Sequence, residues 1–111
     1  MSTILPTDNN NNPIPAVRLK NGGAHTITSA ASAARNASAF NSDTKIISLY
    51  ATEDVYIKFG ASDVVATTSD HFFPKGLYYD LAIGGGDTKQ YSHISALRVS
   101  ANGSVFVSEK E

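Results

Sequence analysis

Three histidines are the side chains of this chain best suited to binding a metal ion. His25, His71 and His93 are far apart in the sequence, and no two of them have the two to five intervening residues that put a ligand pair on one element. Their spacing predicts ordinary polar or strand-edge positions. We therefore expect no metal site and no cofactor.

The stretch Ser69-Asp70-His71 contains the residue types of a hydrolytic triad. Consecutive residues of a strand point to opposite faces, so these three side chains cannot form a relay with one another. Six of the ten acidic residues supply candidate carboxylates, namely Glu53, Asp54, Asp63, Asp70, Asp80 and Asp87. Most of them stand beside Ser, Thr or Gly, where short acidic side chains cap turns. We expect a protein that is not an enzyme and has no catalytic residues.

Two further motifs predict no chemistry. The glycine run 84–86 lacks the spacing of a phosphate-binding loop and is followed by no helix pattern, which predicts a plain turn. Asn36-Ala37-Ser38 and Asn102-Gly103-Ser104 match the glycosylation sequon, but with no secretory signal recognisable we interpret both as coincidences.

Aromatic residues offer a binding function instead. Tyr56, Tyr78 and Phe106 fall out of phase with the apolar positions around them, which predicts that they form an exposed aromatic platform. Such a platform can stack on sugar rings or be buried in a protein–protein contact. The alternative is that these side chains cover loops or the opposite side of a sheet.

Length and composition limit the classes of protein. The chain has 111 residues, enough for one domain with a real core, and no cysteine, which fits a reducing compartment or assembly in a cytoplasm. Its net charge of −1 gives no field for nucleic acid, and only 17% of residues are charged, which suits packing against other protein or plain solubility by hydroxyls and amides. No apolar stretch approaches the ~20 residues of a membrane span, and no signal peptide is recognisable.

Residues 1–16 are expected to form an extended N-terminal arm, separate from a β-sandwich domain over residues 17–111. Four asparagines (residues 9–12) and three prolines (Pro6, Pro13 and Pro15) exclude a helix or a central strand. An arm of this kind serves to reach a partner; the alternative is a terminus without a role.

The elements that follow the arm are short β-strands. They are expected over residues 16–20, 25–28, 45–50, 54–59, 71–73, 77–83, 91–99 and 104–108. In 54–59 the apolar residues Val55, Ile57 and Phe59 share one face, and in 77–83 the same alternation puts Leu77, Tyr79, Leu81 and Ile83 on the core side. Residues 29–40 predict an irregular or small-residue strand segment, with a short helix as the alternative.

Turn residues predict how these strands connect. Asn21-Gly22-Gly23 predicts a hairpin between the first two strands, and Asn102-Gly103 predicts a type I′ hairpin between the last two. A phase slip in 91–99 predicts a β-bulge near Ser95 and Ala96. Seven or eight strands with frequent turns predict an all-β fold, an antiparallel two-sheet sandwich or jelly roll, with an open barrel as the alternative.

Residues 54–109 also resemble a known class of protein. The run DVYIKFGASDVVATTSDHFFPKGLYYDLAI and the closing ANGSVFVSE are similar to small virion proteins of tailed bacteriophages, namely head decoration (cement) proteins or small head and tail accessory proteins. Phe59-Gly60-Ala61, residues 66–72 and Pro74-Lys75-Gly76 carry most of the likeness. The resemblance implies a β-sandwich made in the host cytoplasm that binds the outer surface of a capsid and bridges neighbouring subunits.

This implied function assigns partners and contact residues. The partners would be the major capsid protein and further copies of this chain in a homo-oligomer, with no nucleic acid and no membrane. The expected interface residues are Ile4, Leu5, Pro6, Pro13 and Ile14 of the arm, together with Tyr56 and Tyr78. The arm could add to the edge of a neighbouring sheet, with Ile4 and Leu5 as apolar anchors. The alternative is a tail or adsorption-device accessory protein whose sandwich binds carbohydrate through Tyr56 or Tyr78.

Overall fold

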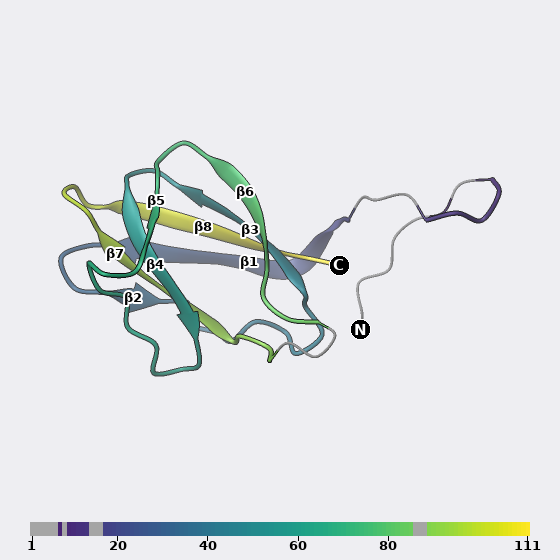
Figure 1. The fold of residues 1–111 in the computed structure, drawn as a ribbon, viewed down its shortest axis with the longest axis horizontal. Coiled ribbons are helices and arrows are strands. Elements are labelled where there is room, and N and C mark those ends of the chain that lie inside the picture. The colour runs from purple at the N-terminus through teal and green to yellow at the C-terminus, as the bar shows by residue number, and fades with distance from the viewer. Residues whose placement is uncertain (1–6, 8, 14–16, 86–88) are drawn as a thin grey trace.

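The computed structural model of the chain describes residues 7, 9–13, 17–85 and 89–111. Within these ranges the chain forms eight strands and no helix (Figure 1). The strands are β1 (Leu19–Ser29), β2 (Ala34–Arg35), β3 (Ile46–Ala51), β4 (Val55–Gly60), β5 (His71–Phe73), β6 (Tyr78–Ala82), β7 (His93–Arg98) and β8 (Gly103–Lys110). Most are rich in β-branched and aromatic residues, which suit a pleated surface.

The strands form two four-stranded antiparallel sheets with the orders β1-β8-β3-β6 and β2-β7-β4-β5 (Figure 1). The pairs β1·β8, β2·β7, β3·β6 and β4·β5 are those of one long hairpin folded over into two layers. This is the strand order of a jelly roll, and it confirms the predicted all-β two-sheet fold.

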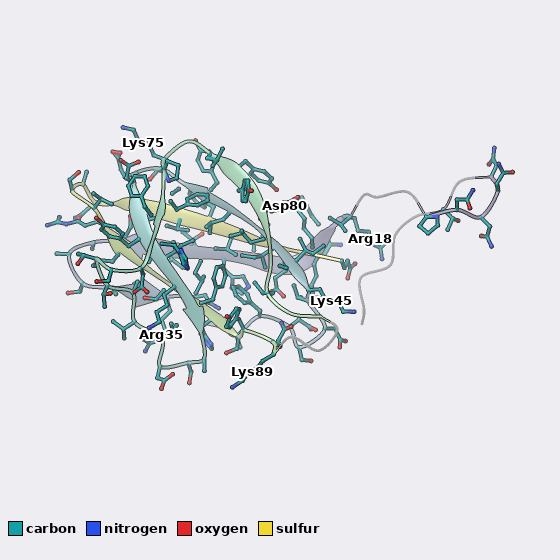
Figure 2. The ribbon with its side chains drawn as sticks, in the orientation of Figure 1. Arg18, Arg35, Lys45, Lys75, Asp80 and Lys89 are labelled. Atoms are coloured by element: carbon teal, nitrogen blue, oxygen red, sulfur yellow. The ribbon has the colours of Figure 1, made fainter. Side chains whose placement is uncertain are left out.

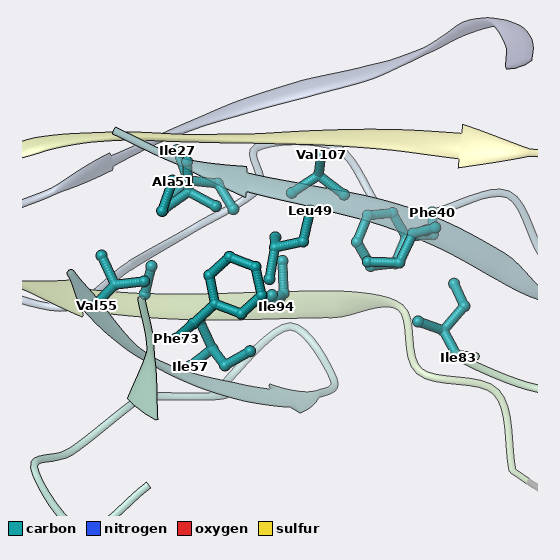
Figure 3. Close-up of a cluster of buried hydrophobic side chains, with 13 residues drawn as sticks. Ile27, Phe40, Leu49, Ala51, Val55, Ile57, Phe73, Ile83, Ile94 and Val107 are labelled. Carbon is teal, nitrogen blue, oxygen red and sulfur yellow. The ribbon is translucent and has the colours of Figure 1, made fainter. Parts of the chain in front are cut away.

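The core lies between the two sheets (Figure 3). β3 buries Ile47, Leu49 and Ala51, and β8 buries Val105 and Val107, because alternate residues of each strand face the opposite layer. The predicted alternation of β4 is confirmed at its two buried residues, Val55 and Ile57. Each Val, Leu or Ile side chain of this set contributes about 1.5–3 kcal/mol when it is fully buried.

The predicted hairpin at Asn21-Gly22-Gly23 is wrong, because both flanking segments belong to one strand, β1, which pairs with β8. Leu19 lies opposite Lys110 and Ala24 opposite Ser108, so residues 20–23 stand against Glu109 alone. Gly22 has φ +79°, and the glycines therefore form an irregularity within a strand instead of a turn.

The predicted type I′ hairpin at Asn102-Gly103 is also wrong. β7 and β8 belong to different sheets, so their connection crosses from one layer to the other. Positive φ is found among the described non-glycine residues only at Asn11, so Asn102 lacks the conformation that a type I′ turn needs. The turn preference of Asn102-Gly103 is overridden because β8 pairs with β1 on one side and with β3 on the other.

The predicted bulge at Ser95 and Ala96 is wrong, since β7 pairs with β4 in regular register from His93 to Arg98. The apolar phase slips because the strand is covered on both faces. Ile94 and Ala96 face the core, while the Ser95 hydroxyl accepts a hydrogen bond from the Ala66 N–H at 2.9 Å under the loop after β4.

Residues 29–40 are irregular, as predicted, apart from the ends of β1 and the two-residue β2. Hydrogen bonds of the Asn36 side chain, and not regular strand pairing, fix this segment. The side-chain N–H groups of Asn36 donate to the carbonyl oxygens of Ser38 (2.6 Å) and Ser92 (3.3 Å), and its Oδ1 accepts from the Ile94 N–H at 2.9 Å.

β6 departs from its predicted burial. Leu81 is half-buried and Ile83, just beyond the strand, is buried, but Leu77 and Tyr79 are 43% and 53% exposed although they were predicted to face the core. β6 is an edge strand, and the edge strand of the other sheet, β5, has only three residues. The two sheets therefore do not close over each other on this side.

The described arm residues fold back instead of running straight. Thr7 and Pro13 form an isolated antiparallel bridge, and Asn11 between them has φ +66°, a left-handed conformation that asparagine tolerates. In Figure 1 this turn lies beyond the end of the sandwich at which β1 begins. The described part of the predicted arm therefore contains a local turn that was not predicted from the sequence.

Candidate interaction surfaces

The histidines stand in separate environments, on β1, β5 and β7. Across the described ranges, no group of three or more His, Cys, Asp or Glu side chains is placed so that it could hold a metal ion. His93 Nδ1 lies 2.8 Å from the hydroxyl of Ser92, and His71 is exposed at the edge strand β5.

His25 belongs to a buried polar cluster at one end of the core. Its Nε2 lies 2.8 Å from Glu109 Oε2, and its ring meets Phe40 edge-on with the centroids 5.1 Å apart. Glu109 Oε1 accepts hydrogen bonds from the Thr44 hydroxyl at 2.5 Å and from the Asn41 N–H at 2.9 Å. Burial acts to raise the pKa of Glu109, but these hydrogen bonds and His25 together hold that pKa below its ordinary value. The cluster joins β1, β8 and the loop before β3, and its burial fits a structural role.

Asp70, of the stretch Ser69-Asp70-His71, caps a turn as predicted. Its Oδ2 accepts from the Thr67 N–H at 2.7 Å and from the Thr67 hydroxyl at 3.0 Å. The Thr67 N–H is the main reason that the pKa of Asp70 is lowered. Both hydrogen bonds lie within one exposed turn, so Asp70 stabilises that turn.

The three aromatics of the predicted platform do not share one surface. Tyr78 and Phe106 are exposed on the outer face of the β1-β8-β3-β6 sheet, in register on either side of Tyr50. Tyr56 lies on the other sheet, where it pairs with Phe72 at a ring distance of 6.2 Å. Tyr50 was not predicted as a member of the platform. The apolar residues Ile47 and Leu49 mark the buried face of its strand, so alternation would have placed Tyr50 on the exposed face.

An apolar groove of about 440 Å³ lies on the side where the two sheets do not close. It runs between the edge strands β5 and β6, with β4 behind them. Its lining residues are Ile57, Phe59, His71, Phe72, Phe73, Pro74, Leu77, Tyr79 and Leu81. Phe72, Leu77 and Tyr79 are 55%, 43% and 53% exposed, so the groove presents large apolar side chains to solvent. The groove was not predicted from the sequence, because the alternation in 77–83 predicts a buried face for Leu77 and Tyr79.

Most of the predicted arm contacts lie outside the described residues: Ile4, Leu5, Pro6 and Ile14. Pro13 is described, and it is exposed in the turn that it forms with Thr7.

Charged side chains are dispersed over the molecule. Arg18, Arg35, Lys75 and Lys89 lie at separate places around the sandwich, so these four form no common basic face (Figure 2). Among the residues that the structure describes, no helix is long and apolar enough to span a bilayer.

Comparison with protein-family models, with curated proteins and with solved structures finds no match for this chain.

Proposed function

We propose that this chain is a non-enzymatic structural protein of a phage virion, which binds the outer surface of the capsid and bridges neighbouring capsid subunits. The observation that carries the proposal is the apolar groove between β5 and β6. The resemblance of residues 54–109 to phage decoration and accessory proteins supplies the identity of the partner.

The groove has the properties of a protein-binding surface. Phe72, Leu77 and Tyr79 leave large apolar areas in water, and apolar and aromatic side chains of this kind are common at the centres of interfaces. β5 and β6 are also edge strands, whose free backbone groups can pair with an extended segment of a partner. A loop or arm of a capsid subunit could therefore gain both apolar contacts and backbone hydrogen bonds here.

Bridging requires a second contact on the same chain, and the N-terminal arm is our candidate for it. The described turn of the arm lies beyond the end of the sandwich, away from its body (Figure 1). Two contacts on one chain, repeated over a lattice, give tight attachment by avidity even where each contact is weak.

Cosedimentation with capsids tests the proposal. The full chain, a Leu77→Ser/Tyr79→Ser variant and a chain lacking residues 1–16 would each be pelleted with undecorated capsids of the phage that encodes the protein. We expect the full chain to pellet and the groove variant to bind at least about tenfold more weakly, since two exposed apolar anchors are lost. Loss of the arm is expected to weaken binding as well.

The matched control is Val65→Ser, which removes an apolar side chain of similar exposure, 52%, that is not part of the groove. This variant should bind like the unmodified chain. Failure of the full chain to pellet with capsids would overturn the proposal, and equal binding by the groove variant would remove the groove from it.

A further inference from the structure

A row of three aromatic side chains crosses the outer face of the β1-β8-β3-β6 sheet. Phe106 on β8 lies opposite Tyr50 on β3, and Tyr50 lies opposite Tyr78 on β6. They are 45%, 37% and 57% exposed. Adjacent strands lie about 4.8 Å apart, so the row extends over roughly 10 Å of an open surface.

Polar side chains flank this row in a fixed arrangement. In the next row across the strands, Ser108 on β8, Ser48 on β3 and Asp80 on β6 lie side by side. Lys110 Nζ donates a hydrogen bond to Asp80 Oδ1 at 2.7 Å. The same ammonium group lies 5.1 Å from the centroid of the Tyr78 ring. Asp80 is half-exposed, so its carboxylate can accept further hydrogen bonds from solvent or a ligand.

The combination fits a sugar chain better than a protein. A pyranose ring has an apolar C–H face, which stacks on an aromatic ring, and hydroxyls that both donate and accept hydrogen bonds. Asp80, whose side chain is half-exposed, can accept from a ring hydroxyl, while Lys110, which is largely buried, holds the carboxylate in position. A protein interface over the same face would have to desolvate the exposed Asp80 carboxylate, which costs free energy, whereas ring hydroxyls replace the water around it. The aromatic row lies on an open sheet face and not in a closed pocket, so it can contact several successive rings of a sugar chain.

We propose that this face of the sheet is a polysaccharide-binding site, in which Tyr78, Tyr50 and Phe106 stack on sugar rings while Asp80, held in position by Lys110, binds a ring hydroxyl. The site is independent of the groove. Neighbouring residues of β6 point to opposite sides of the sheet, so Tyr79 enters the groove while Tyr78 faces outward. A chain attached to a capsid through the groove would leave the aromatic row free to bind glycan.

The test begins with the full chain on an array of bacterial capsular polysaccharides and lipopolysaccharide O-chains. The oligosaccharide that binds best is then titrated by calorimetry against the variants. We expect Tyr78→Ala to raise the Kd about tenfold, the effect of losing one stacked ring, and Tyr78→Phe to leave it nearly unchanged. Asp80→Asn should also weaken binding.

The matched control is Tyr56→Ala, which removes a tyrosine from the other sheet and should bind as the unmodified chain does. Circular dichroism melts establish that each variant is folded; if Tyr78→Ala is not, Phe106→Ala on β8 tests the same row. No glycan bound on the array would overturn the proposal, as would equal weakening by Tyr56→Ala and Tyr78→Ala. Capsid cosedimentation is a separate measurement and is not affected by either result.

Discussion

Glu109 is a buried carboxylate whose stabilising contacts depend on its charge. Its pKa is held below the ordinary value of 4.5, so the unfolded chain takes up this proton at a higher pH than the folded chain does. The contribution of Glu109 is therefore present above pH 4.5 and is lost as the pH falls through the folded-state pKa. We expect Glu109→Gln to lower the free energy of unfolding by about 1–3 kcal/mol at pH 7, and by less in acid. Urea titrations between pH 3 and 7 measure both effects.

Glu111→Gln is the control, because it makes the same change two residues further along. Glu111 forms partly exposed ion pairs with Arg18 at 3.2 Å and with Lys20 at 3.7 Å, and pairs of this kind contribute about 0–1 kcal/mol. If both variants lost equal stability and kept the pH dependence of the unmodified chain, Glu109 would have no special role.

Asn36 is the second residue with a large expected effect. Two of its three hydrogen bonds, with Ser92 and Ile94, fix the irregular segment against the start of β7, the third stays within the segment, and the side chain is buried. Asn36→Ala leaves the Ile94 N–H without its acceptor, and we expect a loss of about 2–3 kcal/mol, measured as a fall of the thermal midpoint. Asn102→Ala removes one exposed contact with Arg98 and should change stability by less than about 0.5 kcal/mol. Similar midpoints for the two variants would contradict this account.

At the scale of elements, the two glycines in β1 are expected to resist substitution for different reasons. Gly22 has φ +79° and open space around it, so Gly22→Ala meets only backbone strain of about 1 kcal/mol. At Gly23 a Cβ would lie 2.8 Å from Glu109 Cβ and 3.1 Å from the Lys20 carbonyl oxygen, so Gly23→Ala must displace β8. We expect the second substitution to cost about 1–3 kcal/mol, with Gly22→Asn nearly neutral. Denaturant midpoints measured for the three variants test these expectations. If Gly23→Ala were as stable as Gly22→Asn, the close approach of β8 to Gly23 would be contradicted.

Strands were more predictable from the sequence than their partners. β4, β5 and β8 follow from alternation and β-branched content, because these depend on neighbouring residues alone. The two hairpin predictions failed at Asn21-Gly22-Gly23 and Asn102-Gly103 because strand pairing in a jelly roll is non-local: β8 pairs with the first and third strands, not with β7. The groove was missed for the same reason, since the exposure of Leu77 and Tyr79 depends on which strands form the sheet edges.

For the whole molecule, the decisive contacts join opposite ends of the chain. Beyond the strand pairing, Arg18 and Glu111 exchange two backbone hydrogen bonds, at 3.0 and 2.8 Å. β8 is a central strand, and it contributes Val105 and Val107 to the core. Folding must therefore wait for the last strand, and we expect refolding on the millisecond-to-second scale of non-local β folds.

Deleting each end of the chain should have unequal consequences. A chain lacking residues 103–111 loses a central strand and should not fold, giving no cooperative thermal transition. A chain lacking residues 1–16 keeps all eight strands and the Arg18–Glu111 pairing, so its midpoint should stay within about 2 °C of the full chain, because the buried core cluster of the described residues lies within 27–107. Scanning calorimetry of both chains measures this. A large fall in the midpoint of the arm deletion would show that the arm belongs to the folded unit, and its loss could then no longer be interpreted as removal of a capsid contact alone.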